Sequence, residues 1–211
     1  MSAEILILDH VAKTYGNKVV LKNISVTFKS GQVYLICGEN GAGKSTLLNI
    51  IAGLSSLSLG KIIRNSENVG YLGHSTFIYN GLTAYENLNF WKNVYNLSLD
   101  KSHILNLLER VGLLSYAYER AGVFSRGMMQ RLNLARLLML NPDIILMDEP
   151  STGLDIASHQ MLHTEIINAK EKGACILMVS HDILKDRNIA DMVLNIKNHS
   201  IGFFGTINDW E

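Results

Sequence analysis

The nine residues GENGAGKST (38–46) decide how this sequence is interpreted. They match the pattern G-x-x-x-x-G-K-[ST] from Gly38 to Ser45. Glycines at positions 41 and 43 let the backbone adopt positive φ angles, so successive amide N–H groups can surround a phosphate. Lys44 adds a positive charge for the terminal phosphates, and the Ser45 hydroxyl is a ligand for Mg²⁺. An ordinary glycine-rich turn is the alternative interpretation.

The neighbours of this loop favour phosphate binding over an ordinary turn. The run VYLIC (33–37) is apolar on both faces, as in a buried central strand. After the loop, leucine and isoleucine recur with the spacing of one helix face. A helix that begins at the loop aims the positive end of its dipole at the phosphates. The sequence therefore predicts a site for a nucleotide triphosphate, contacted by Gly38, Asn40, Gly41, Ala42, Gly43, Lys44, Ser45 and Thr46.

A second apolar strand, IILMDE (144–149), ends in two acids. Asp148 is the candidate metal-side carboxylate, acting through a metal-bound water, and Glu149 is the candidate general base beside the γ-phosphate. Side chains alternate along a strand, so the two acids project in opposite senses unless the strand ends there. Taken alone, the acids would equally fit the start of a solvated loop.

Composition excludes several classes of protein. The 211 residues include 19 basic and 19 acidic side chains, 47% apolar residues and 18% charged residues. This apolar content excludes disorder, and the neutral charge argues against a nucleic-acid partner. No apolar run approaches the ~20 residues that span a bilayer, and the first residues lack a signal-peptide pattern. Cys37 and Cys175 lie in apolar runs, so we expect buried strand cysteines without a disulfide in a cytoplasmic protein.

The order of predicted elements indicates one α/β domain over residues 1–211. Strands alternate with helices, which favours a largely parallel sheet. Residues 75–140 carry only helical patterns, predicted over 83–120 and 126–140, and interrupt this alternation. We therefore expect a core of about 1–74 and 141–211 with an inserted helical lobe of about 75–140. A helix over about 157–171, a strand at ACILMVS and a closing hairpin complete the pattern.

The order of several further segments resembles the ATP-binding cassette (ABC) ATPase family across nearly the whole chain. FSRGMMQRL (124–132) resembles the family's signature segment, and PSTGLD (150–155) resembles its D-loop. VSHD (179–182) resembles its switch-histidine segment, and Tyr15 falls where an aromatic residue stacks on adenine. The resemblance implies a P-loop NTPase fold of the ABC ATPase type. Such a fold has a mixed, largely parallel sheet core, an N-terminal antiparallel β part and an inserted α-helical lobe.

The resemblance also implies roles that spacing alone does not supply. Two such domains pair head to tail, with ATP between the phosphate loop of one and the signature segment of the other. Ser125 and Gly127 would then bind the γ-phosphate held by the partner subunit. His181 would hold the γ-phosphate and the attacking water, and Asp155 would support the contact across the dimer. ATP and Mg²⁺ are the implied cofactors, with Lys44, Glu149 and His181 catalytic and with Ser45 and Asp148 at the metal.

The sequence departs from the family pattern in two places. The usual signature Leu-Ser-Gly-Gly-Gln is Phe-Ser-Arg-Gly-Met here, so Arg126 adds a cation near the nucleotide and Met128 removes a polar contact. The family's glutamine loop is replaced by Gly73-His74-Ser75. We hypothesise that His74 takes part of the glutamine's role at the metal and water. A surface histidine in a loop is the alternative.

As a whole the sequence predicts an ATP-hydrolysing subunit of a transporter. It would dock on a separate integral membrane subunit, at the cytoplasmic face of the membrane, and couple ATP-driven dimerisation to substrate translocation. Segments YLGH (71–74) and LTAYENL (82–88) are similar to the ATP-binding subunits of cytochrome c maturation haem exporters. The alternatives are another exporter, a soluble ABC ATPase without a transport role, and a metabolic P-loop kinase. A metabolic P-loop kinase would not need the segments at 124–132 and 179–182, which argues against that alternative.

Two side-chain groups remain outside this scheme. His159 and His163 are spaced i, i+4 on a predicted helix, which suits zinc, but no third ligand is apparent in the sequence. We therefore expect a solvated helix face. The second group consists of aromatic residues in the predicted lobe, which either form its core or make a docking surface for a partner. They are Tyr85, Phe90, Trp91, Tyr95, Tyr116 and Tyr118.

Overall fold

The computed structural model describes residues 3–73, 76–180 and 182–210. Its first strands form a small antiparallel sheet of order β2-β1-β4. The strands are β1 (Glu4–Tyr15), β2 (Lys18–Lys29) and β4 (Leu59–Arg64). Apolar and polar residues alternate along β1 and β2, so one face of this sheet is buried and the other is exposed. The expected N-terminal antiparallel part is therefore confirmed.

A second sheet carries the candidate site and has the order β5-β6-β7-β3-β8-β9. The neighbouring strands from β5 to β8 run parallel, and only β9 runs antiparallel, to β8. Every residue of β3, β6 and β7 is buried, which explains why these strands are apolar apart from Asp148 at the end of β6. The strands are β3 (Val33–Cys37), β5 (Val69–Leu72), β6 (Ile144–Asp148), β7 (Cys175–Val179), β8 (Met192–Lys197) and β9 (Ser200–Thr206).

The core lies on both faces of the six-stranded sheet, because side chains alternate along each strand. From β3, Tyr34 and Ile36 pack toward the antiparallel sheet and α1 (Lys44–Ile51). Val33 and Leu35 point the opposite way and pack with the apolar residues of the remaining large helices. The strand that leads into the phosphate loop is thus held from both sides.

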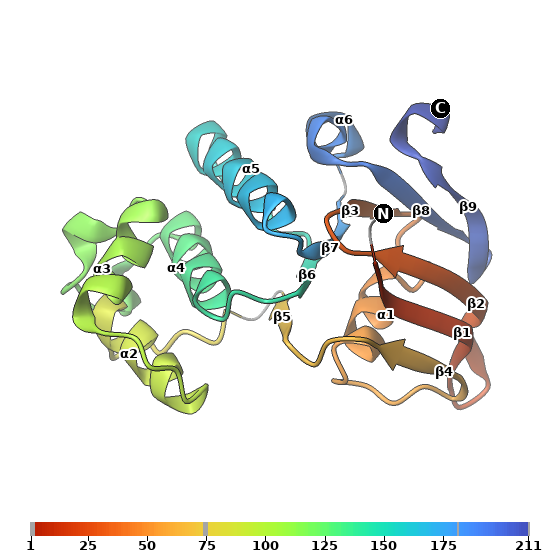
Figure 1. The fold of residues 1–211 in the computed structure, drawn as a ribbon, viewed down its shortest axis with the longest axis horizontal. Helices are drawn as coiled ribbons and strands as arrows, with labels where there is room; N and C mark the ends of the chain where they lie inside the picture. Colours follow the sequence, from red (N-terminus) through yellow and green to blue (C-terminus); the bar gives the residue numbers. More distant parts are fainter. Residues whose placement is uncertain (1–2, 74–75, 181, 211) are drawn as a thin grey trace.

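Helices α2 (Ala84–Val94), α3 (Lys101–Arg110) and α4 (Arg126–Met139) lie together on one side of the molecule (Figure 1). Helix α5 (Ile156–Glu171) lies between this group and the rest of the fold (Figure 1). The expected helical run over 83–120 is in fact two helices and one short 3₁₀ turn, joined by loops. The short helices are α6 (Ile183–Asp186), η1 (Leu114–Tyr116), η2 (Ala121–Val123), η3 (Arg187–Ile189) and η4 (Ile207–Asp209).

The two cysteines are free and buried, as expected. Burial raises the pKa of the Cys37 thiol to about 11 and that of the Cys175 thiol to about 12. Both side chains are therefore neutral structural residues of central strands. Within the described ranges, none of the helices has the length and apolar character needed to cross a membrane.

Candidate functional site

The phosphate loop connects β3 to α1 and depends on glycine at two crowded positions. Gly38 has a φ of 138°, and a Cβ there would lie 2.4 Å from the carbonyl oxygen of Ile196. Gly43 has a φ of 105°, and its Cβ would lie 2.8 Å from the carbonyl oxygen of Val20. Gly41 also has a positive φ, of 83°, but no atom lies within 4 Å of an added Cβ. The loop is thus packed against the fold at its two ends and open at Gly41.

Lys44 is the first residue of α1 and is buried, with 6% of its surface exposed. Its Nζ donates hydrogen bonds to the carbonyl oxygens of Gly38, at 2.8 Å, and Glu39, at 3.0 Å. These two contacts fold the side chain back over its own loop. The ammonium group therefore lies on the concave side of the loop, where a phosphate would be bound.

Ser45 and Asp148 bring a hydroxyl and a carboxylate together from different elements. The Ser45 Oγ donates a hydrogen bond of 3.0 Å to Asp148 Oδ1. Asp148 ends β6 and is 3% exposed. Hard oxygen ligands of this kind are those that Mg²⁺ prefers, so this pair fits the metal-binding role expected from the sequence.

Glu149 follows Asp148 in a left-handed backbone conformation, with a φ of 54°. Strand β6 ends at Asp148, and the Glu149 amide donates to the Val179 carbonyl oxygen at 3.1 Å. A non-glycine residue in this region costs about 1–3 kcal/mol and is frequent at functional sites. The turn removes the strand alternation that would have separated the two acids.

Most of the predicted nucleotide-binding residues line one cavity of about 380 Å³. Tyr15 lies at its margin with 55% of its surface exposed, and the Lys13 ammonium lies 4.7 Å from the centre of its ring. An exposed ring in this position is suited to stacking on a base. The lining comprises Tyr15, Lys18, Val20, Asn40, Gly41, Gly43, Lys44, Ser45, Thr46 and Glu149. Gly38 and Ala42 line a separate, adjacent hollow on the other side of the loop.

The signature-like segment does not line the phosphate cavity. Ser125 is exposed and caps α4, since its Oγ accepts a hydrogen bond of 3.2 Å from the Met128 amide. Gly127 lies in the first turn of that helix, where an added Cβ would meet only Ser125 Oγ, at 4.0 Å. Arg126 lies beside Gly153, with its Nε 3.2 Å from a Cβ built there. This segment therefore contacts the D-loop-like segment of its own chain.

Asp155 caps α5 and is exposed, as the sequence-based role at a dimer contact would need. Its Oδ1 accepts a hydrogen bond of 2.7 Å from the Ser158 amide, and this backbone hydrogen bond lowers the pKa of the carboxyl group. Two predicted residues, His74 and His181, lie outside the described residues.

The expectation of a solvated helix face at His159 and His163 is wrong. Their side chains are only 17% and 16% exposed, because both face Asp186 of α6. They line a second cavity, of about 470 Å³, that also includes Glu149 and Asp155. The i, i+4 spacing was visible in the sequence, but no signal there pointed to Asp186.

The aromatic residues of the lobe divide between core and surface. Tyr85, Trp91 and Tyr95 pack against the buried cluster of the lobe. Phe90 is 38% exposed, and its ring lies 4.9 Å from that of Tyr79, which is 48% exposed. The core interpretation therefore holds for Tyr85, Trp91 and Tyr95, whereas a docking role for the exposed Phe90 stays a prediction.

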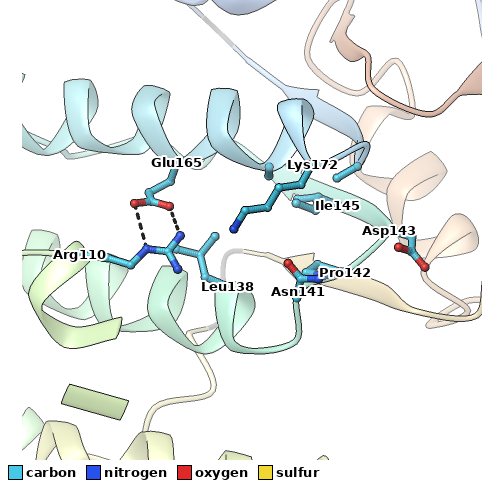
Figure 2. A pocket seen from close by; sticks show the side chains of 10 residues that line it. Arg110, Leu138, Asn141, Pro142, Asp143, Ile145, Glu165 and Lys172 are labelled. Carbon is cyan, nitrogen blue, oxygen red and sulfur yellow. Dashed lines mark hydrogen bonds and ion pairs between the residues drawn. The ribbon is translucent and has the colours of Figure 1, made fainter. Parts of the chain in front are cut away.

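The lobe is joined to the sheet region by two charged side chains. Arg110 of α3 donates from Nε and Nη2 to the two carboxylate oxygens of Glu165 on α5 (Figure 2). The buried Arg136 of α4 donates to the Tyr71 carbonyl oxygen on β5 at 3.0 Å. Its guanidinium carbon also lies 5.2 Å from the ring centre of Trp91. The hydrogen bond from Arg136 to Tyr71 thus reaches β5, the strand that precedes the predicted His74 loop.

Comparison with known proteins places these features in a family. The model of the ABC transporter family matches residues 21–152. ABC transporter ATP-binding protein NatA of Bacillus subtilis is 36% identical over 201 residues, covering 89% of this chain and 82% of NatA. Cytochrome c biogenesis ATP-binding export protein CcmA of Photobacterium profundum is 32% identical, covering 87% of this chain and 95% of CcmA. A solved ATP-binding subunit of an ABC transporter is 25% identical with a TM-score of 0.88, covering 97% of this chain and 91% of that one.

Proposed function

This chain belongs to the ABC transporter family, and from that premise we propose that it couples ATP-driven dimerisation to translocation by a separate membrane subunit. The family and fold make it an ATP-binding cassette, in agreement with the fold class expected from the sequence. One observation carries the proposal. The phosphate-binding residues converge on one cavity, whereas the signature-like Ser125 is exposed elsewhere on the surface.

ATP binding is assigned to the residues of the phosphate cavity. Tyr15 stacks on the base, the amides of the loop surround the phosphates, and Lys44 exchanges its carbonyl contacts for phosphate oxygens. Ser45 and Asp148 would hold Mg²⁺, which when bound would neutralise charge on the phosphates. Their 3.0 Å contact, between two hard oxygen ligands, supports this assignment.

Hydrolysis is assigned to Glu149 as general base, with His181 holding the attacking water by family resemblance. Glu149 lines both the phosphate cavity and the cavity beside Asp155. A carboxylate at this junction can accept the proton of a water that attacks a phosphate bound at Lys44. His74 remains our hypothesis for the role of the missing glutamine.

The second half of the hydrolytic site is proposed to come from another copy of the chain. Ser125 is exposed at the start of α4 and Gly127 lies in its first turn, so on this proposal their polar groups contact a phosphate on a facing molecule. The helix also directs its positive dipole end outward at this point. Head-to-tail pairing would bring Ser125 of one protomer to the phosphate loop of its partner.

The membrane subunit is proposed to dock on the exposed aromatic edge of the lobe, formed by Phe77, Tyr79 and Phe90. These rings are 38–48% exposed and contact one another or Trp91. Aromatic residues are enriched in protein interfaces. Phe90→Ala should lower recovery of the membrane subunit by co-purification and preserve ATP affinity, whereas Leu59→Ala, exposed on β4, should change neither.

Haem export is our proposal for the cargo, and it rests on the segments at 71–74 and 82–88. The likeness to CcmA, at 32% identity, supports it, although the likeness to NatA, at 36% identity, does not point to haem. Purification of the chain with its membrane subunit, followed by the absorption spectrum of bound small molecules, tests this step. A complex that retains ATP hydrolysis but contains no haem would contradict haem export and favour another exporter.

The proposed dimer mechanism is tested by measuring ATP turnover per chain as the protein is diluted. Turnover should fall as dimers dissociate, since each protomer holds half of the hydrolytic groups. Carrier protein should be added at each dilution to exclude losses on surfaces. Full turnover per chain in material shown to be monomeric by light scattering would contradict the proposal.

A further inference from the structure

We propose that His159, His163 and Asp186 form a binding site for a divalent transition-metal ion of the zinc type. Their ligand atoms lie within 4.8 Å of one another. In the ranges that the structure describes, no other histidine, cysteine or acidic side chains form such a group of three. The inference rests on these contacts and does not depend on the proposed transport function.

The geometry of α5 and α6 creates the group. The i, i+4 spacing places both histidines on one face of α5, with ring centres 4.2 Å apart. The Nε2 atoms of His159 and His163 lie 3.3 Å and 2.7 Å from the same oxygen, Oδ1 of Asp186. Zinc ligands at ~2.1 Å from a tetrahedral ion lie about 3.4 Å from one another. Small side-chain rotations, which lengthen the shorter of these contacts, would therefore place the three atoms around an ion.

The carboxylate is held in place for this role. Asp186 is 1% exposed, and its second oxygen accepts a hydrogen bond of 2.5 Å from the buried Ser180 hydroxyl. Burial would raise the pKa of Asp186, but hydrogen bonds from His163 and Ser180 outweigh it and hold the pKa below its usual value. A ligand anchored through its outer oxygen in this way is typical of metal sites in proteins.

The donor set indicates which class of ion would bind. Two imidazole nitrogens and one carboxylate oxygen suit zinc and its neighbours in the first transition row, whereas Mg²⁺ prefers oxygen ligands alone. The buried thiols of Cys37 and Cys175 are neutral and belong neither to this group of three nor to the lining of the cavity beside it. The cavity of about 470 Å³ beside the histidines leaves access for the ion and room for a water as fourth ligand.

A metal ion here would join two elements that border the hydrolytic residues. Helix α5 begins directly after Asp155, and α6 follows the VSHD segment. The same cavity also includes Glu149. An ion bound to both helices would fix their relative positions, so we expect thermal unfolding to shift upward when zinc binds.

The test is titration of the chelator-treated, nucleotide-free protein with Zn²⁺ and with Co²⁺ as a spectroscopic probe. We expect one Zn²⁺ per chain, a rise in Tm and a Co²⁺ visible spectrum typical of nitrogen and oxygen ligands. His163→Gln should weaken Zn²⁺ affinity by about 100-fold or more, because it removes a ligand. Ser180→Ala, which changes only the support of the carboxylate, should weaken it about 10-fold.

The matched control is His103→Gln. His103 also contacts an aspartate, with Nδ1 2.9 Å from Asp100 Oδ1, but this pair is exposed on α3. The loss of the His103 imidazole should leave the Zn²⁺ affinity of the protein unchanged. The proposal is overturned by absence of Zn²⁺ binding at micromolar concentrations, by equal affinity in His163→Gln, or by a Co²⁺–thiolate charge-transfer band. If His163→Gln fails to fold, His159→Gln gives the same comparison.

Discussion

The phosphate loop and the signature-like segment carry their polar groups in different ways. The loop is built into the core, with a buried lysine, two crowded glycines and a serine bonded to a buried aspartate. The signature-like segment begins a surface helix, and its exposed serine accepts a hydrogen bond from the first turn of that helix. One segment is fixed within the fold, and the other, on the proposed dimer mechanism, would meet a phosphate on a facing molecule.

The difference means that substitutions in the two segments should have separable effects. Changes at the loop should alter binding of ATP to a single chain. Changes at the signature-like segment should leave that binding intact and affect the steps that need two chains. Glu149 belongs to neither group, because it lines the phosphate cavity but is proposed to act in hydrolysis.

The largest effect is expected for Glu149→Gln. Removing a general base slows a reaction by about 10²–10⁴-fold, so ATP turnover should fall by this amount and ATP affinity should remain. The variant should also accumulate as an ATP-bound dimer in size-exclusion chromatography. Glu171→Gln, at the exposed end of α5, is the control. Unchanged turnover in Glu149→Gln would refute the assignment of the base.

Lys44→Ala should reduce ATP affinity by about 10- to 100-fold, because a charge-assisted contact is worth about 1.5–3 kcal/mol. The effect should appear in a single-chain binding titration, before any dimer forms. Lys61→Ala removes an exposed lysine paired with Asp9 at 3.3 Å and should leave affinity unchanged. Normal affinity in Lys44→Ala, in a variant with normal circular dichroism, would exclude Lys44 as a phosphate ligand.

The parts of this site that could be predicted from sequence are those encoded in contiguous stretches. Strands β3, β6 and β7 are unbroken apolar runs, and the residues with chemical roles lie where these runs end. Helices α4 and α5 begin after Ser125 and Asp155, which are good capping residues. In these stretches local propensity and burial favour the same element.

What could not be predicted depends on distant contacts or on unmarked backbone geometry. Asp186 lies 23 residues beyond His163 on a helix of four residues, too short to show a helical period. Glu149 adopts a positive φ that its residue type does not signal. The division of the lobe aromatics between core and surface follows from packing of α2 on its neighbours, which periodicity alone does not resolve.

Comparison of Ser125→Ala with Ser125→Asp separates two roles of Ser125, its cap of α4 and its proposed contact with phosphate. Alanine removes the cap, at about 1 kcal/mol of stability, and the proposed phosphate donor. Aspartate restores the cap but places a negative charge toward the phosphate. Both variants should lose ATP turnover by about 10-fold or more and keep single-chain ATP affinity, and aspartate alone should regain thermal stability.

Thr83→Ala is the matched control for these variants, since Thr83 caps α2 through a comparable bond from the Glu86 amide of 3.1 Å. It should lower stability by about 1 kcal/mol and leave turnover per folded chain unchanged. Full turnover in Ser125→Asp would show that this serine acts only as a helix cap.

The smallest effect is expected at the ion pair between Arg110 and Glu165, which joins the lobe to α5 (Figure 2). Glu165 is 7% exposed and Arg110 38%, so solvent screens the pair in part. A double-mutant cycle of Arg110→Gln and Glu165→Gln, followed by urea unfolding, should give a coupling energy of about 1 kcal/mol. The exposed pair of Lys61 and Asp9 should give a coupling near zero. Equal coupling in the two cycles would contradict a contribution of this ion pair to the attachment of α3 to α5.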